Sequence, residues 1–424
     1  MIRFLLKGIL QDRHRSLLPL IVICIGVALT VLGHAWVTGV MGESIDMSAR
    51  FSTGHLKVMT RAYAGEQAQI PLDLALSGAT ALLDELRREV PGVDWAPRIR
   101  FGGLIDFPDS SGATRAQGPA AGYAIDLLTP GAAEAARFNL ASALLTGRLP
   151  LHPEEALLTQ DFAEKFAVQP GDTFTFIGST MEGSMAFHNL TVAGTVRFGI
   201  AALDHGAFII DLSAGRQALA MPDAAGEILG FFRDDRYSQR RADALAAAFN
   251  ARHSRADDEF SPFMVTMREQ EGMARLLDYA HLVALILVTI FLLAMSVVLW
   301  NTGLIGGLRR YGEFGVRLAL GEGKNHLYKT LILEALLIGM IGSAAGTLIG
   351  LGLAWYLQSS GLDIGYASKT STMMMPAIMR ARITTADWYI GFIPGLLSMT
   401  LGSALSGLGI YKRNTAQLFK ELDA

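Results

Sequence analysis

Four stretches of the chain are free of Asp, Glu, Lys and Arg for long enough to cross a membrane. They are Ser16–Val40, Tyr279–Gly303, Ala335–Leu357 and Trp388–Tyr411. A helix needs about 20 apolar residues to span a hydrocarbon layer roughly 30 Å thick. The pattern therefore predicts one membrane span, a large domain of ordinary globular composition, and then three further spans.

The first apolar stretch follows basic residues at the N-terminus, as a secretory signal peptide also would. Its run is longer than the roughly 7–15 residues of a signal peptide's apolar region, and no A-x-A cleavage site follows it. We expect a retained helix, with Pro19 tolerated in its first turn.

Lysine and arginine in the short flanking segments predict the orientation. Three basic groups fall on the same side of a four-span topology: Arg3, Lys7, Arg13 and Arg15; Arg309, Arg310, Arg317 and Lys324; and Lys412, Arg413 and Lys420. The loop of residues 358–387 opposes this bias with Lys369, Arg380 and Arg382. The balance predicts a multi-pass membrane protein with both termini in the cytoplasm and the large domain outside it.

Helical and strand patterns alternate within the large domain, which predicts an α+β fold with two lobes that divide near Leu149–Pro153. The periodicity predicts helices over Thr80–Val90 and Arg236–His253. Alternation and turn residues predict strands over Phe51–Met59, Thr173–Ile177, Leu190–Val196 and Ala207–Ile210. From Phe263 onward only Gly272 interrupts a helical pattern, so we expect a stalk helix that carries Gly272 and Leu276 and continues into the second span.

Composition narrows the function classes. Charged residues make up 18% of the chain, hydrophobic residues 51%, and the formal net charge is −3. These values exclude a disordered chain and a nucleic-acid-binding one, and they favour the lipid bilayer as the chain's surroundings. The single cysteine, Cys24, lies in an apolar run and cannot form an intrachain disulfide.

No catalytic or metal-binding motif occurs in the sequence. Gly323-Lys324 lacks the remaining residues of a G-x-x-x-x-G-K-[ST] phosphate loop, and there is no G-x-S-x-G, H-E-x-x-H or C-x-x-C. The nine histidines are scattered, without the spacing of metal ligands. We therefore expect no catalytic residue, metal site or cofactor site on this chain.

The segment between the second and third spans predicts a short amphipathic helix. Phe314, Val316–Arg317 and Leu320 fall on or near one face of it. One interpretation is an interfacial helix that holds lipid headgroups, and the other is a docking helix for a cytoplasmic partner.

Small residues recur at intervals of four in the last two spans, a spacing that lets helices approach closely in lipid. Pro394 predicts a kink in the fourth span. These small residues allow close packing either between helices of one chain or between two copies of the chain. The third span carries Gly342, Gly346 and Gly350, with Gly339 one turn earlier, and the fourth carries Ser398, Gly402 and Ser406.

These segments resemble the FtsX-like permease domain of MacB-type ABC transporters. The resemblance covers Tyr311–Gly350 and rests on Glu313, Gly315, Arg317, Ala319, Gly321 and the triplet Leu333–Ala335; Glu322 departs from it, since a small residue is usual there. The C-terminal Tyr411–Leu418 is similar to the family's basic end, Gly147–Phe176 resembles the MacB-like periplasmic core, and Thr53–Met59 is similar to lipoprotein-releasing permeases of the LolC/LolE type.

The resemblance implies the membrane subunit of a type VII ABC transporter, a non-catalytic chain that transmits motion across the membrane. It also implies a coupling helix for the ATPase that contains Glu313, Phe314, Gly315, Arg317, Leu320 and Gly321. The implied partners are a cytoplasmic ATPase dimer that carries ATP and Mg²⁺, a second permease copy or paralogue, the bilayer, and a periplasmic carrier or adaptor, with no nucleic acid.

Three functions stay open: lipoprotein or amphiphile release, which we place first; efflux of peptides or drugs through an adaptor and an outer-membrane duct; and signalling without transport. The expected segments are as follows. Residues 1–15, 304–326 and 412–424 are cytoplasmic, and residues 42–278 and 358–387 are periplasmic. The membrane helices are 16–41, 279–303, 327–357 and 388–411, and the FtsX-like permease domain covers 304–420.

Overall fold

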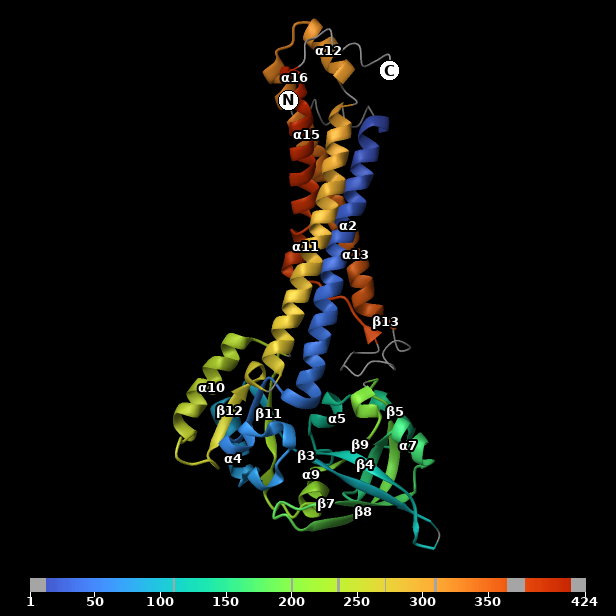
Figure 1. Ribbon diagram of the computed structural model, residues 1–424, viewed down its shortest axis with the longest axis vertical. Helices are drawn as coiled ribbons and strands as arrows, with labels where there is room; N and C mark the ends of the chain where they lie inside the picture. The colour runs from blue at the N-terminus through green and yellow to red at the C-terminus, as the bar shows by residue number, and fades with distance from the viewer. Residues whose placement is uncertain are drawn as a thin grey trace. The chain divides into compact units, whose positions relative to one another are not determined.

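The computed structural model describes residues 13–109, 111–199, 201–234, 237–270, 272–308, 311–363 and 378–412. Its contacts separate the chain into a helical unit and an α/β unit (Figure 1). Of the described residues, the helical unit contains those in 13–43, 279–363 and 378–412, and the α/β unit contains those in 44–278. Several basic residues of the orientation argument lie outside the described residues: Arg3, Lys7, Arg309, Arg310, Lys369, Arg413 and Lys420.

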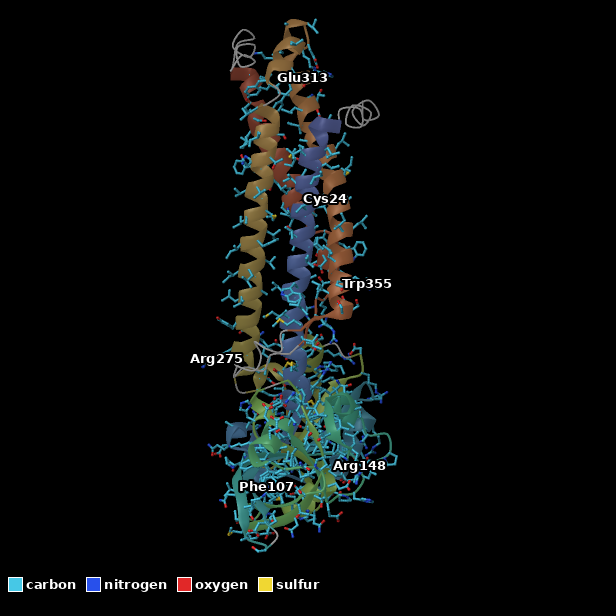
Figure 2. All side chains as sticks on the ribbon, turned by 90° about the vertical axis from the view of Figure 1, so that its right-hand side faces the viewer. Cys24, Phe107, Arg148, Arg275, Glu313 and Trp355 are labelled. Carbon is cyan, nitrogen blue, oxygen red and sulfur yellow. The ribbon has the colours of Figure 1, made fainter. Side chains whose placement is uncertain are left out.

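Among the described residues, four helical segments are long and apolar enough to cross a membrane, as predicted: Leu17–Thr53, Met273–Gly306, Lys324–Ser360 and Thr385–Gly407. They contain helices α2 (Arg13–Ser48), α11 (Met273–Leu308), α13 (Lys324–Ser360) and α15 (Met399–Gly407). Two short helices lie outside them, α12 (Tyr311–Ala319) before α13 and α16 (Gly409–Lys412) after α15. Within the helical unit, Glu313 lies at one end, Cys24 near the middle and Trp355 toward the other end (Figure 2).

The fourth segment is irregular around Pro394. It starts with the 3₁₀ turn η5 (Thr385–Trp388) and continues as the π-helical turn η6 (Ile393–Ser398) before α15 begins. Proline has no N–H for the regular i→i−4 bond and its ring clashes with the preceding turn, so the backbone widens there.

The stalk predicted from Phe263 is wrong in its first part. Residues Pro262–Thr266 form strand β12, the 3₁₀ turn η4 (Met267–Glu269) follows, and α11 begins only at Met273. Gly272 has φ +77°, a left-handed conformation that favours glycine, so it precedes the helix and does not lie inside it. Leu276 does lie in α11.

The α/β unit is built on one ten-stranded sheet in the order β12-β1-β11-β3-β4-β9-β6-β8-β5, with β7 paired to both β3 and β8. These pairings close β3-β4-β9-β6-β8-β7 into a six-stranded barrel. The strands are β1 (Leu56–Thr60), β3 (Val93–Pro108), β4 (Thr114–Ile125), β5 (Leu144–Gly147), β6 (Glu155–Thr159), β7 (Thr173–Ser179), β8 (Met185–Val196), β9 (Ala207–Asp211) and β11 (Glu227–Phe232).

Short helices cover the sheet: α3 (Arg61–Gly65), α4 (Ala79–Glu89), α5 (Glu134–Arg137), α6 (Leu140–Ala143), α7 (Gln160–Phe166), α8 (Ala201–Asp204), α9 (Leu212–Ala218) and α10 (Gln239–His253). The remaining elements are the 3₁₀ turns η2 (Gln67–Gln69) and η3 (Leu72–Leu74), the π-turn η1 (Ala49–Thr53), and the two-residue strand pairs β2 (Leu76–Ser77) with β10 (Ala224–Ala225) and β13 (Leu362–Asp363) with β14 (Ile378–Met379).

The two largest apolar cores of this unit do not divide the chain near Leu149–Pro153 as predicted. One core, rich in phenylalanine, includes Phe107, Phe174 and Phe208 from the barrel. The other lies under α4 and α10 and draws residues from both ends of the domain, such as Leu56 and Met264. The sixteen-residue strand β3 contributes to both cores, because its first half pairs with β11 and its second half with β7.

The backbone of the edge strand β12 is hydrogen-bonded by the Asn250 side chain of α10. The Asn250 amide of α10 donates to the Met264 carbonyl at 2.8 Å and accepts from the Met264 N–H at 2.7 Å. A side-chain amide in this arrangement copies the pairing that a neighbouring strand would make.

Candidate functional site

Helix α12 has an apolar face that packs within the chain. Tyr311 and Phe314 are buried in a cluster with Leu327, Leu331 and Ile410, and Phe314 is only 1% exposed. The Tyr311 hydroxyl also donates to the Ser406 carbonyl at 2.6 Å. The expectation that Phe314 contacts a partner is therefore wrong: its ring holds α12 against α13 and α16.

The opposite face of α12 is open and also apolar. Val316 is 42% exposed, Leu320 is 82% exposed, and Ala319 between them is exposed too. These three residues together form an open apolar patch at the end of a helix that is fixed from its other side, and such a patch is typical of a contact surface. Among the residues expected in the docking helix, Leu320 thus has the geometry for contact and Phe314 does not.

The turn from α12 to α13 is tightly specified. Gly321 has φ +92°, and the Gly321 and Glu322 amides donate to the carbonyls of Leu318 and Arg317 at 3.1 Å each. This is the Schellman arrangement that ends a helix with a left-handed glycine. It explains why a glycine stands at position 321.

Glu322, which departs from the family pattern, has a partner within the same turn. Its two carboxylate oxygens each lie 2.7 Å from a nitrogen of Arg317, Nε and Nη2. A bidentate pair of this geometry fixes the guanidinium of Arg317 beside the open face of α12. The departure therefore orders the turn without leaving an uncompensated charge.

The glycine stripe of α13 faces α2 within the same chain. A Cβ added at Gly342 would lie 2.8 Å from Ile23 Cγ2, at Gly346 2.6 Å from the Cys24 carbonyl oxygen, and at Gly350 2.8 Å from the Ala28 carbonyl oxygen. Backbones this close leave no room for a side chain. Gly339 faces Gly395 of η6, and Gly402 faces the Trp300 carbonyl of α11 in the same manner.

A histidine–aspartate pair lies inside the helical unit. His34 Nδ1 of α2 is 2.7 Å from an Asp387 carboxylate oxygen, and the Asp387 side chain is fully buried. The other carboxylate oxygen accepts from the Thr384 amide at 2.6 Å and from its hydroxyl at 2.8 Å. The sequence analysis did not predict this pair. The spacing Thr384-x-x-Asp387 before an apolar run is that of a capping box and could have indicated a structural role for Asp387, but nothing in the sequence links it to His34.

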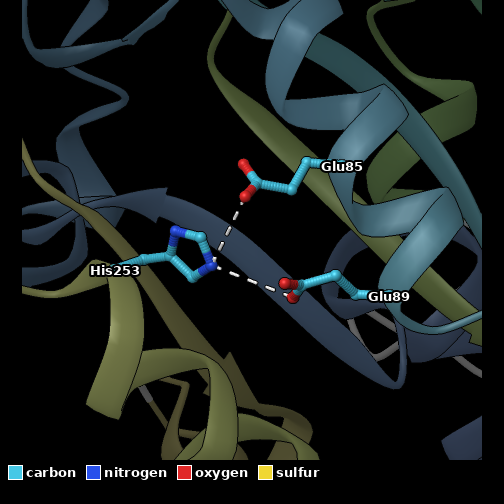
Figure 3. A group of neighbouring side chains, drawn as sticks. All are labelled: Glu85, Glu89 and His253. Carbon is cyan, nitrogen blue, oxygen red and sulfur yellow. Dashed lines mark ion pairs between the residues drawn. The ribbon is translucent and has the colours of Figure 1, made fainter.

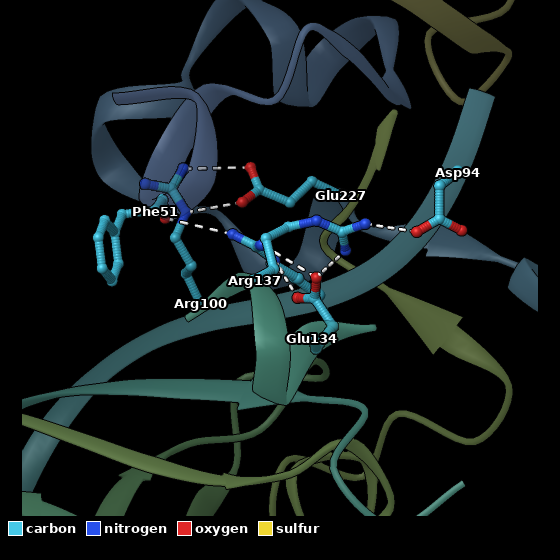
Figure 4. A network of polar contacts seen from close by, with 7 residues as sticks. Phe51, Asp94, Arg100, Glu134, Arg137 and Glu227 are labelled. Carbon is cyan, nitrogen blue, oxygen red and sulfur yellow. Dashed lines mark hydrogen bonds and ion pairs between the residues drawn. The ribbon is translucent and has the colours of Figure 1, made fainter. Parts of the chain in front are cut away.

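In the α/β unit, a buried ionic network lies beneath η1, the π-turn at the end of the first long helix (Figure 4). Arg98, 1% exposed, bonds Glu134 through Nε at 2.5 Å and through Nη2 at 3.2 Å, and it donates to the Phe51 carbonyl at 3.4 Å. Arg137 contacts both Glu134 and Asp94. Strand β3, helix α5 and turn η1 are thereby tied together by charged groups.

A second group of charges continues the network across three strands. Glu227 of β11 lies 2.8 Å from Lys57 Nζ of β1 and 3.0 Å from Arg100 Nε of β3. Burial lowers the pKa of Lys57 to about 8, against the opposing pull of Glu227. The pKa of Glu227 is held below its ordinary value by Arg100 and Lys57, which outweigh its burial.

The two chain segments that enter and leave the α/β unit meet at one point. The buried Gln270 side chain donates to the Thr53 carbonyl at 2.8 Å, and the Met267 amide donates to the His55 carbonyl at 3.3 Å. An apolar cluster surrounds these bonds and consists of Ile45, Ala49, Tyr237, Met267, Met273 and Leu277. The end of the first long helix and the start of α11 therefore form one packed joint.

Two family models match the chain. The model of the MacB-like periplasmic core domain matches residues 16–247, more than half of the chain, and that of the FtsX-like permease C-terminal domain matches residues 285–415. The chain belongs to the MacB-type permease family. This confirms the resemblance drawn from the sequence and the fold class, a four-helix membrane protein with a large α/β domain after the first helix.

Curated relatives of this permease are matched over part of their length. The chain is 25% identical over 160 residues to "Macrolide export ATP-binding/permease protein MacB" of Brucella abortus, which covers 38% of this chain and 24% of that protein. It is 27% identical over 110 residues to the protein of the same name from Wolinella succinogenes, covering 26% and 15%. The chain thus spans about a quarter or less of the curated relatives that it matches.

Among solved structures, the permease is similar to the periplasmic region of MacB from Actinobacillus actinomycetemcomitans, at 13% identity and a TM-score of 0.36. That similarity covers 52% of this chain and 91% of the solved one.

A surface cluster on the permease's α/β unit brings together Glu85 and Glu89 of α4 and His253 of α10 (Figure 3). His253 Nε2 lies 4.0 Å from Glu85 and 3.8 Å from Glu89. Glu89 also pairs with Arg252 at 2.7 Å. Because an arginine already neutralises one carboxylate, we interpret the cluster as an ion-paired contact between α4 and α10.

Proposed function

We propose that this chain is the permease subunit of an ABC transporter that couples ATP hydrolysis on a separate chain to the release or export of amphiphilic molecules on the extracytoplasmic side. ATP and Mg²⁺ would be bound by the partner ATPase dimer, and this chain would supply no catalytic group. A second permease copy or paralogue would complete the transporter.

The observation that carries the proposal is the two-sided construction of α12. One face is fixed to the chain by buried Phe314 and the Tyr311–Ser406 bond, and the other presents Val316, Ala319 and Leu320 to a partner. A helix held in this way transmits displacement of a bound partner to α13 and to α16. The basic residues near the span ends support a cytoplasmic position for α12.

Two substrate classes fit the proposal. Lipoproteins or similar amphiphiles of the membrane's outer leaflet follow from the similarity of Thr53–Met59 to lipoprotein-releasing permeases. Efflux of small molecules or peptides through an adaptor protein and an outer-membrane duct is supported by the relatives named for macrolide export. A permease that only signals to an extracytoplasmic partner is a third candidate.

The test is co-purification in mild detergent, with the bound proteins identified by mass spectrometry. The tagged wild-type chain should retain an ABC ATPase, and Leu320→Asp should lose it, because a charge would replace the most open apolar side chain of α12. Asn325→Asp adds the same charge at an exposed position on the next helix and should retain the ATPase. Retention by Leu320→Asp, or the absence of any ATPase with the wild-type chain, would overturn the proposal.

A further inference from the structure

An apolar row crosses four neighbouring strands on the outer wall of the barrel. Pro119 of β4 pairs with Leu104 of β3, Leu104 with Ile177 of β7, and Ile177 with Phe187 of β8. Residues directly opposite each other on adjacent strands point to the same face of a sheet. The four side chains therefore form one line across the wall, on the face opposite to the phenylalanine core.

This row is open to solvent. Leu104 is 39% exposed and Phe187 is 63% exposed, while Met185, two residues before Phe187 on the same face, is 69% exposed. Pro119 is exposed as well, and Ile177 is half-buried. With strands about 4.8 Å apart, the row is about 14 Å long. A continuous apolar line of this length on a water-facing domain is typical of a binding surface for an extended apolar group.

A carboxylate without a cation borders the row. Asp106 follows Leu104 by two residues on β3 and so lies on the same face. One of its carboxylate oxygens is buried and has no hydrogen-bond partner, and no basic side chain of the described residues lies within ion-pairing distance. Its neighbours across the strands, Thr175 and Asn189, bond each other at 2.8 Å. Asp106 as a whole is only half-buried, and a carboxylate with one unsatisfied oxygen favours a donor or a positive charge brought by a ligand.

We propose that this outer-wall surface, defined by Leu104, Asp106, Pro119, Ile177 and Phe187, binds cationic amphiphiles. The alkyl part lies along the apolar row and the ammonium group reaches Asp106. The inference rests on the proposed function and narrows its substrate class. Charge complementarity selects the occupant, because an anionic amphiphile would face the Asp106 carboxylate and a neutral one would leave it unpaired.

The test uses the full-length chain in lipid nanodiscs and two photoreactive probes. Both carry a diazirine on a dodecyl chain, one with an ammonium head and the other with a sulfate head. The labelled residues are mapped by mass spectrometry. Labelling of the exposed side chains of α11, which both probes reach through the lipid, serves as the reference in every sample.

The ammonium probe should label residues of β3, β7 and β8 along the row, and the sulfate probe should not. Asp106→Asn should lower this labelling about fivefold relative to α11, the change expected for one partly exposed ion pair. Glu182→Gln removes an exposed carboxylate from the nearby β7–β8 turn and should leave the labelling unchanged. Phe187→Ser, a change at an exposed position that does not endanger folding, should remove the labelling.

Equal labelling by both probes, unchanged labelling of Asp106→Asn, or a protein crosslinked to the row in place of the probe would overturn this inference. ATPase co-purification is measured on the same preparations. If the ATPase binds and the row is not labelled, the substrate class is wrong while the permease function stands; loss of the ATPase from the wild-type chain contradicts the permease function itself.

Discussion

The buried ionic network beneath the first long helix allows a quantitative test. Replacing Arg98 by Leu would leave the buried Glu134 with only Arg137 as a partner and the Phe51 carbonyl without its donor. Removal of one partner from a buried ion pair typically costs 3–5 kcal/mol. Because Arg137 still neutralises part of the Glu134 charge, we expect the lower end, about 3 kcal/mol.

The chain contains a matched control for this change. Arg148 approaches Glu155 to 2.5 Å, the same separation as Arg98 and Glu134, but its side chain is 51% exposed where that of Arg98 is 1% exposed. Water screens Arg148, and Glu155 keeps the backbone amides of Leu151 and His152 as donors, so Arg148→Leu should cost less stability than Arg98→Leu. The double variant Arg98→Leu/Glu134→Leu should recover part of the loss, because it leaves no lone charge between them.

Hydrogen exchange of the β3 and β11 amides, followed by mass spectrometry, measures these differences within the full-length chain. A loss of about 3 kcal/mol corresponds to a roughly hundredfold faster exchange when exchange is limited by the opening equilibrium. Equal exchange rates in the Arg98→Leu and Arg148→Leu variants would refute the conclusion that the buried network stabilises the contact of β3 with α5 and η1.

Two further changes test the helical packing and the buried lysine. Gly346→Leu would place its Cβ 2.6 Å from the Cys24 carbonyl oxygen and should lower the thermal unfolding midpoint of the detergent-solubilised chain. Gly352 has open space around it, so Gly352→Leu should leave the midpoint unchanged. Equal midpoints in the two variants would contradict the close contact of α13 with α2. Burial lowers the pKa of Lys57 from an ordinary 10.5 to about 8. Between these two pH values Lys57 is protonated in the unfolded chain and largely neutral in the folded one. The unfolding free energy should therefore rise from pH 8 to about 10. Urea unfolding of Lys57→Met should lack that rise, and an identical pH profile in both chains would show that Lys57 is not desolvated.

Much of the fold could be predicted because its signals are local. The four apolar stretches became the four candidate spans, and the predicted helix Thr80–Val90 became Ala79–Glu89. The strand predicted over Phe51–Met59 begins only at Leu56, because Ala49–Thr53 extends the preceding helix as a π-turn that ends at Gly54 with φ +61°.

What the sequence could not provide depends on contacts between distant segments. Amphipathicity predicted an apolar face on α12, but not that Phe314 faces α13 while Leu320 stays open. Arg98 meets Glu134, and His34 meets Asp387, through strand register and helix packing that no spacing rule encodes. The error at Gly272 has a similar origin, since pairing of Pro262–Thr266 with β1 overrides the helical pattern.

The bonds between Asn250 and Met264 affect the exposed edge of the long sheet. The long sheet ends at β12 on one side and at the four-residue β5 on the other, and an unpaired strand edge can recruit a strand from another molecule. Asn250 occupies the donor and acceptor of Met264 on β12, and Pro262 at the start of that strand has no N–H to offer. The side chain of Asn250 thus occupies the hydrogen-bonding groups that Met264 would otherwise offer to a strand of another molecule, which makes this edge of the sheet less prone to intermolecular pairing.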